Sequence, residues 1–228
     1  MRLVIMLSLI FSASLQAADS VKATIVKYQI LEPGIEPYIS RMIVTAHQVR
    51  MDDDENDGSY LLFSRECGLI ESINHSEQSV FVIHPKKVSV EPPFPLTQKT
   101  ERLPLDDAPA IGGKKAQQFQ LLVNGEHCQS IVSVEGLLTD TIKAWRKFRH
   151  VLAGEHAATL SYVPADQLLG CDLALNTFSP GWFLDFGLPV QSMEVGGRGM
   201  LLIDYTLNKQ VDPQLFVLPE DYHRYSAE

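Results

Sequence analysis

The chain has 228 residues and is acidic, with 28 Asp and Glu against 19 Lys and Arg and a formal net charge of −9 at pH 7. This balance argues against nonspecific binding to nucleic acid and against electrostatic docking on anionic lipid, because both need clustered Lys and Arg. The length suits one large domain with a sizeable core.

Residues 1–17 have the layout of a secretory signal peptide. Arg2 precedes an apolar core at Leu3–Phe11, and a small and polar stretch follows up to Ala17. The apolar core is far shorter than the ~20 residues that a membrane-spanning helix needs, so an uncleaved anchor is the less favoured alternative. We expect cleavage close to Ala17, export to the periplasm, and a soluble mature chain of residues 18–228.

After a first predicted strand at Val21–Leu31, the chain shows consecutive strands separated by polar turns. Val, Ile, Tyr and Phe dominate the runs, as is typical of strands. Strands joined by loops too short to hold a crossover helix must be antiparallel, so the sequence predicts a β-meander. Its expected strands are Tyr38–Met51, Ser59–Ser64, Gly68–Asn74 and Ser79–His84.

The turn at Asp52–Gly58 is acidic, which raises the question of a calcium site. Asp53, Glu55 and Asp57 fall at the first, third and fifth positions of an EF-hand loop. The twelfth position would be Ser64, where such a loop needs a bidentate Glu, and the flanking elements are predicted strands rather than helices. We therefore expect a solvated hairpin turn and no metal site.

A proline-rich excursion then interrupts the strands. After a short predicted strand at Val88–Val90, residues 91–113 carry five prolines and no periodicity. Proline removes a donor that a central strand needs, so we expect an ordered flap or a mobile loop here. Strands resume at Lys114–Val123, and the hairpin signal Asn124-Gly125 leads into Glu126–Val134.

Two helices are predicted late in the chain. The first spans Thr139–Ala153, where either Thr139 or Asp140 could cap the start. The second begins at Pro164, whose fixed φ suits the first helical position, and runs to about Asn176. Apolar residues recur at helical spacing in the first helix, at Ile142, Trp145, Phe148 and Leu152, with Arg149 as an alternative to Phe148.

The outer face of the first predicted helix is basic. Such a stripe on an acidic protein could meet an anionic partner or headgroup, but a solvated helix face is the commoner case and the one we expect. Its members are Lys143, Arg146, Lys147, Arg149 and His150.

A last predicted strand pair, Leu188–Val195 and Gly199–Leu207, flanks a turn at residues 196–198. In its second strand one face collects Leu201, Ile203, Tyr205 and Leu207. The count reaches nine or ten antiparallel strands, and a sheet of that width should curl. The sequence therefore predicts a mainly β (α+β) fold, a curled antiparallel sheet or half-open β-barrel with two helices inserted late, as a single domain over residues 18–228.

All three cysteines lie in the expected mature chain, and an oxidising compartment favours one disulfide. Three pairs are possible. Cys67 sits at an expected hairpin turn, where its sequence neighbours can close the structure unaided. Cys128 lies on a predicted strand and Cys171 in a predicted helix, so we predict a Cys128–Cys171 disulfide, with Cys67 free or buried.

No catalytic signature appears in the sequence. GxSxG, HExxH, GxxxxGK[ST] and CxxC are absent, and the seven histidines are dispersed. A triad assembled in space would leave no such signature. We predict no enzyme, no cofactor and no bound metal.

The layout of a signal peptide, a long meander, a Gly-initiated strand pair, helices and a final hairpin resembles the periplasmic lipoprotein-carrier (Lol-type) superfamily. Two segments strengthen the likeness to exported proteins of that fold. They are Ile111–Lys114 leading into Phe119–Val123 and Cys128, and the closing stretch Asp212–Tyr222. The resemblance implies a half-open β-barrel with helices at its mouth that binds acyl chains or acts as an interaction module.

We therefore expect an exported, non-catalytic binding protein that holds an apolar ligand, such as an acyl chain, a lipid or a lipoprotein, in the curled sheet. The alternative is a structural or regulatory interaction module of the cell envelope, with a filled core and an envelope protein as partner. Large apolar side chains near the helices could line a ligand site, although a plain core uses the same residue types. They are Trp145, Phe148, Trp182, Phe183 and Phe186.

Overall fold

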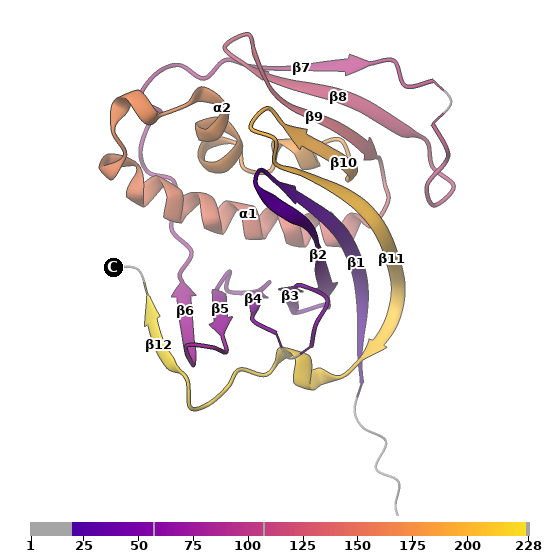
Figure 1. Cartoon of the computed structure of the whole chain (residues 1–228), viewed down its shortest axis with the longest axis vertical. Helices are drawn as coiled ribbons and strands as arrows, with labels where there is room; N and C mark the ends of the chain where they lie inside the picture. The colour runs from indigo at the N-terminus through magenta and orange to yellow at the C-terminus, as the bar shows by residue number, and fades with distance from the viewer. Residues whose placement is uncertain (1–19, 57, 107, 227–228) are drawn as a thin grey trace, which may run out of the picture.

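The computed structural model describes residues 20–56, 58–106 and 108–226, so the predicted signal peptide lies outside the described residues. Within that part, twelve strands form one sheet that curls without closing (Figure 1). The mainly β fold, the curled sheet and the two late helices are confirmed, whereas the expected nine or ten strands are too few. No helix among the described residues is long and apolar enough to cross a membrane.

The N-terminal part of the sheet is the predicted antiparallel meander. The expected strand Tyr38–Met51 is two strands, because a tight turn interrupts it. In that turn Thr45 and Gln48 exchange hydrogen bonds, with the backbone N of Thr45 2.9 Å from the carbonyl of Gln48. The strands are β1 (Val21–Glu32), β2 (Ile35–Val44), β3 (Gln48–Asp52), β4 (Tyr60–Ser64), β5 (Ile70–Asn74) and β6 (Ser79–Ile83).

The proline-rich excursion contains a strand that the sequence did not predict. This strand lies between Pro95 and Pro104, so the prolines flank it rather than enter it, and it forms a sheet edge. The short strand expected at Val88–Val90 is wrong, because that stretch is exposed and unpaired. The remaining strands are β7 (Gln98–Leu103), β8 (Ala116–Val123), β9 (Glu126–Val134), β10 (Leu188–Glu194), β11 (Gly199–Val211) and β12 (His223–Ser226).

The helices differ from the prediction in their ends. The first continues past Ala153, and it starts after Leu138 without a side-chain cap, while Asp140 accepts two hydrogen bonds from Arg65. The second does not start at Pro164, whose ψ of 139° is extended, and most of its expected length is short turns. The elements are α1 (Thr139–Thr159), α2 (Gly170–Leu173), a π-helical turn η3 (Ala174–Phe178), and 3₁₀ turns η1 (Leu160–Tyr162), η2 (Ala165–Gln167), η4 (Trp182–Leu184) and η5 (Pro213–Phe216).

The sheet order is β12-β6-β5-β4-β3-β2-β1-β11-β10-β9-β8-β7, so β11 joins the two halves by pairing with β1. Its register shifts against β1 at Ile203 and again near Asn208, and such bulges increase local twist. The first bulge brings Tyr205 to the inner face with Leu202, while Ile203 is exposed. The predicted shared face of Leu201, Ile203, Tyr205 and Leu207 is therefore wrong.

Helix α1 crosses the concave face and separates two clusters of the core (Figure 1). On the side of the meander, Phe148 packs edge-on against Phe63, with ring centroids 5.7 Å apart. On the other side, the start of α1, α2 and η4 pack on β8 to β10. Trp145 contacts both clusters and lies 5.7 Å from the ring of Tyr28. The helix thus packs into the space that an open half-barrel would leave empty.

The C-terminal arm, residues 212–226, covers the outer face of the meander. Phe216, Leu218 and Tyr222 pack on a cluster that includes Leu62 and Val80. The arm ends as β12, which pairs parallel with β6. Strands β4 to β6 are therefore covered by the arm on their outer face, and β6 is not a free edge.

The predicted disulfide between Cys128 and Cys171 is confirmed, with Cα atoms 5.2 Å apart. It links β9 to α2 across a sequence separation of 43 residues. Cys67 is free and exposed, which agrees with the predicted pairing.

The acidic turn after β3 is not simply solvated, because the Asp52 side chain is fully buried between Arg41 and Arg50. Asp54, which is partly exposed, pairs with Lys27. In the described part of the chain, no group of three His, Cys, Asp or Glu side chains is placed to hold a metal ion. The turn is thus held in place by several ion pairs.

Replacing Gly154 by alanine should lower the unfolding free energy by about 1–3 kcal/mol. A Cβ at this position would collide with the carbonyl oxygen of Lys86, where the chain leaving β6 passes α1. Alanine is the better helix former by roughly 1 kcal/mol, but a backbone collision outweighs that gain. Urea denaturation measures the effect. As a control, Gly170→Ala would make only ordinary contacts and should change stability by less than about 0.5 kcal/mol; equal stability of the two variants would contradict the close packing at Lys86.

Candidate functional site

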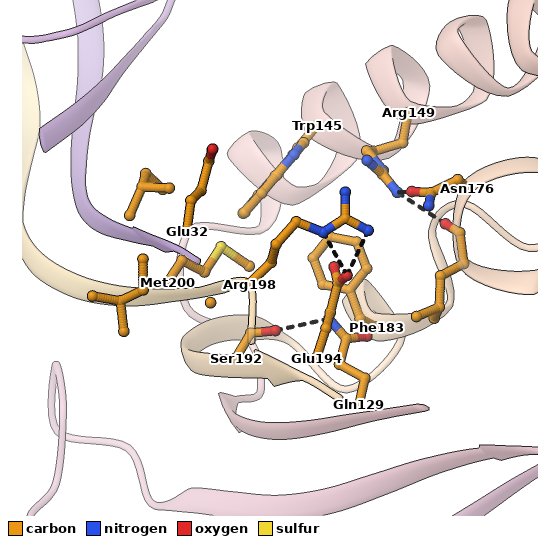
Figure 2. A pocket seen from close by; sticks show the side chains of 14 residues that line it. Glu32, Gln129, Trp145, Arg149, Asn176, Phe183, Ser192, Glu194, Arg198 and Met200 are labelled. Carbon is orange, nitrogen blue, oxygen red and sulfur yellow. Dashed lines mark hydrogen bonds and ion pairs between the residues drawn. The ribbon is translucent and has the colours of Figure 1, made fainter. Parts of the chain in front are cut away.

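A cavity of about 220 Å³ lies between the middle of α1 and the ends of strands β1, β10 and β11 (Figure 2). Its walls come from the end of β1, the β10–β11 hairpin, one residue of β9, the middle of α1, and the segment from η3 to η4. These elements are far apart in sequence and meet because β11 pairs with β1 on one side and β10 on the other.

The inner wall of the cavity is apolar. Trp145 from α1 and Phe183 from η4 meet edge-on, with ring centroids 5.5 Å apart. Ile30 and Met200 come from the paired strands β1 and β11, where they are direct cross-strand partners. Phe183 is only 6% exposed, so this wall is firmly packed from behind.

Arg149 stands one helical turn after Trp145 and lines the same cavity. Its guanidinium donates hydrogen bonds to the carbonyls of Leu175 (2.8 Å) and Pro180 (3.1 Å) and to Asn176 Oδ1 (2.9 Å). Burial lowers the pKa of Arg149. Among the described residues, no Asp or Glu oxygen lies within the 4.0 Å of a salt bridge to this guanidinium.

Two of the acceptors of Arg149 belong to the π-helical turn η3. In this turn the backbone N of Ser179 donates to the carbonyl of Ala174 at 2.8 Å, a bond that spans five residues. Turns of this kind are rare and often occur at functional sites. Here the wider turn presents the carbonyl of Leu175 and the side chain of Asn176 to Arg149, so the turn and the helix are fastened together beside the cavity.

A polar pair lies on the strand side of the cavity. Gln129 on β9 is 4% exposed, and its Nε2 donates to Oγ of Ser192 on β10 at 2.7 Å. Its Oε1 is buried and has no hydrogen-bond partner among the described residues. Leaving such an amide oxygen unpaired costs about 1–3 kcal/mol, and Gln129 carries this cost in the wall of the cavity.

The remaining charged residues at the rim already have partners. Arg198 pairs with Glu194 across the tip of the β10–β11 hairpin, at 2.9 Å from Nη2 to Oε2. Tyr38 donates to Oε1 of Glu32 at 2.7 Å, and burial together with this hydrogen bond raises the pKa of Tyr38 to about 12. Arg149 is thus the charged group of the cavity that is held by neutral oxygens alone.

A second hollow of about 410 Å³ adjoins the first and shares three of its lining residues, Arg149, Asn176 and Arg198. Its other walls are mostly polar or come from the end of α1, with His156 and Asp172 among them. The two arginines therefore stand between the first hollow, named the apolar hollow for its inner wall although half of its lining residues are polar or charged, and this second, polar hollow.

The five aromatic residues predicted as ligand lining do not form one site. Trp145 and Phe183 line the cavity, whereas Phe148 is a core residue packed on Phe63. Phe186 stacks on Phe119 with ring centroids 4.3 Å apart. Trp182 lines a separate hollow of about 670 Å³ on the surface, several of whose lining residues are exposed.

Of the predicted solvated face of α1, Lys143, Lys147 and His150 are exposed as expected, whereas Arg146 and Arg149 are partly buried. Arg146 donates to the carbonyl of Gly181 and pairs with Asp185 at 2.6 Å, and Lys147 donates to two backbone carbonyls, of Arg65 and Glu66. Arg149 points inwards to η3 and the cavity (Figure 2). The helical spacing did indicate that Arg149 could point inwards, since Arg149 shares a helix face with Trp145.

The polar members of the site could not be recognised from the sequence. Gln129, Ser192 and Arg198 each lie on a different strand or turn, and only the pairing of β9, β10 and β11 brings them together. No motif spacing marks them.

No family model matches the chain, and no curated protein matches it. Among solved structures, PNGF-II in a C2 crystal form is similar with a TM-score of 0.42 and 13% identity, over 91% of this chain and 31% of that one. A P21 form of PNGF-II gives 0.40 and 12%, over 90% and 32%. An uncharacterized conserved protein from Thermus thermophilus gives 0.44 and 7%, over 89% and 90%. The chain spans about a third of the length of PNGF-II, and likenesses at this level carry no argument about function.

Proposed function

We propose that this chain is an exported, non-catalytic binding protein whose ligand places an apolar part in the cavity beside Trp145 and Phe183. One observation carries the proposal, namely a concave site with an apolar inner wall and a few convergent polar groups at its rim. Small-molecule sites in proteins share this composition.

The size of the cavity supports a smaller ligand than the resemblance to lipoprotein carriers implies. At about 220 Å³, it is below the roughly 300–1,000 Å³ of sites that enclose a drug-sized molecule. If a methylene group takes about the ~30 Å³ share of a water molecule, the cavity has room for about seven of them. A single medium-length chain, or the end of a longer one, fits this space better than a diacylated lipoprotein does.

The interaction-module alternative is supported by a different observation, the filling of the concave face. Helix α1 buries eight of its residues, and the two core clusters meet at Trp145. Under this alternative the exposed Val88 and Val90 and the proline-rich excursion would be contact surfaces. The cavity would then be incidental.

A series of linear alcohols tests the proposal. Affinity should rise about fourfold per added methylene from butanol to octanol, because each buried CH₂ contributes about 0.8 kcal/mol, and should level off beyond the length that the cavity holds. Two-dimensional NMR titration measures both the affinities and the residues that shift. Native mass spectrometry of the detergent-free protein, followed by solvent extraction, checks for a retained ligand.

A pair of variants serves as the control for this series. Met200→Phe adds bulk inside the cavity and should weaken octanol binding at least about tenfold, whereas Leu201→Phe, the next residue along β11, does not line the cavity and should leave it unchanged. Affinity that is independent of chain length, or equal loss in both variants, would contradict a ligand in this cavity. Failure of the wild type to bind any alcohol would favour the interaction module.

A further inference from the structure

Arg149 lines the cavity and forms no ion pair with a carboxylate among the described residues. All its hydrogen bonds go to neutral oxygens, those of Leu175, Asn176 and Pro180. By contrast, Arg146, one turn earlier on the same helix, pairs with Asp185 at 2.6 Å. Glu194 and Asp172 act on Arg149 and offset part of the fall in its pKa that burial causes, but neither carboxylate forms an ion pair with the guanidinium. A partly buried guanidinium without a paired carboxylate favours binding an anion from outside.

The placement of Arg149 along α1 supplies a direction for a ligand. Trp145 lines the apolar hollow only, Arg149 lines both hollows, and His156 lines the polar one only. Figure 2 shows Trp145 and Arg149 reaching from α1 into the cavity, while the Glu32 carboxylate lies on the other side of Trp145. A chain lying against Trp145 would therefore bring a terminal group to Arg149 and any further extension into the second hollow.

Gln129 is a second polar side chain in the wall of the cavity. Its side chain is buried at 4% exposure, lines the apolar hollow, and keeps Oε1 without a partner among the described residues. A purely hydrocarbon ligand would leave this group unpaired.

We infer that the ligand is a single-chain anionic amphiphile. Its carboxylate or phosphate oxygens pair with Arg149, because the planar set of N–H donors in a guanidinium matches the geometry of these anions. Its alkyl chain lies against Trp145 and Phe183. This inference rests on the proposed function and specifies the chemical class of the ligand. Arg198 remains paired with Glu194 at the rim, so Arg149 alone supplies the charge.

Four probes with the same eight-carbon chain test this inference: octanol, octanoate, octyl phosphate and octyltrimethylammonium. Wild-type protein should bind octanoate and octyl phosphate about 10- to 100-fold more tightly than octanol, because hydrogen bonds to charged groups contribute about 1.5–3 kcal/mol. The ammonium probe should bind no better than octanol. The stronger of the two anions identifies the headgroup chemistry, and added salt should reduce the preference.

Arg149→Gln should remove the preference for the anions over octanol, since glutamine keeps a donor for η3 but no charge. The matched control is Lys143→Gln, which removes an exposed charge from the same helix away from the cavity and should change nothing. Isothermal titration calorimetry measures each affinity. Should Arg149→Gln fail to fold, Arg149→Lys decides in its place, and retention of the preference is the expected result.

The outcomes separate the two levels of the proposal. Equal affinity for octanoate and octanol in the wild type, or a preference that persists in Arg149→Gln, overturns the anionic ligand and leaves the binding function standing. No binding of any of the four probes to the wild type overturns the binding function itself. Loss of the preference in a folded Arg149→Lys variant would also count against a role for the charge.

Discussion

Replacing Asp52 by asparagine should lower the unfolding free energy by about 3–5 kcal/mol, although it exchanges one oxygen for an amide nitrogen. The Asp52 side chain is fully buried and accepts two hydrogen bonds from Arg41, at 2.7 Å each, and one from Arg50 at 2.6 Å. Arg50 is itself only 2% exposed and lies over the ring of Tyr60, 3.8 Å from its centroid. Without the carboxylate, two guanidinium groups keep their charge in a buried site.

The loss should extend to the C-terminal arm, because Arg50 also donates to the carbonyl of Leu215 at 2.8 Å. The same arm is held by Tyr60, whose hydroxyl donates to the carbonyl of Val217 at 2.9 Å. We therefore expect the Asp52→Asn variant to expose residues 212–226 to limited proteolysis before the rest of the chain unfolds. Urea denaturation followed by tryptophan fluorescence measures the global effect.

Asp54→Asn is the matched control for this change. Asp54 belongs to the same turn and pairs with Lys27 and Arg41, but its side chain is 31% exposed. Exposed ion pairs contribute at most about 1 kcal/mol, so this variant should stay close to the wild type. Similar stability of both variants would mean that backbone carbonyls alone compensate the charge of Arg50.

The local parts of the fold could be predicted because their signals are short-range. Asn124-Gly125 was expected to form a hairpin, and both residues have positive φ, 55° and 85°, with Val123 opposite Glu126 across the turn. Short runs rich in Val, Ile, Tyr and Phe, separated by polar turns, likewise indicated the meander. Strands β7 and β12 were missed because they are exposed edge strands with no alternating pattern, and only their partners define them.

The second predicted helix failed for a related physical reason. Proline suits a first helical turn, but a helix needs an apolar face to pack, and Tyr162 and Leu169 on either side of this start are 84% and 65% exposed. The chain becomes helical where Leu173 and Leu175 are buried against the sheet. Tertiary packing thus decided where this helix lies.

In the candidate site, too, some residues could be predicted from local sequence and others only from tertiary packing. Trp145 and Phe183 were recognisable because large apolar residues near helices must be buried somewhere. The role of Arg149 depends on the π-helical turn that faces it, and that of Gln129 on a cross-strand bond to Ser192. Residue type predicted the apolar wall, whereas the polar groups that would select a ligand follow from long-range pairing alone.

Removing the disulfide should be the other large effect, at about 4 kcal/mol for a closed loop of 43 residues. The disulfide joins Cys128 on β9 to Cys171 in α2, so it restricts the conformations of the unfolded chain between them, which includes α1 and the turns that follow it. The Cys128→Ser/Cys171→Ser double variant tests this by urea denaturation, and Cys67→Ser, at an exposed free thiol, is the control that should match the wild type.

The structure also predicts which segment would lose stability first when the disulfide is removed. Helix α2 is four residues long and leads directly into η3, which holds Arg149 through Leu175 and Asn176. Without the disulfide, amide hydrogen exchange should accelerate in residues 170–178 before it does in the meander, because short helices are held by their contacts rather than by themselves. Ligand binding at the cavity should weaken in the same variant. Uniform acceleration over the whole sheet, with residues 170–178 no faster than the rest, would show that packing alone holds this wall and that the disulfide stabilises only the fold as a whole.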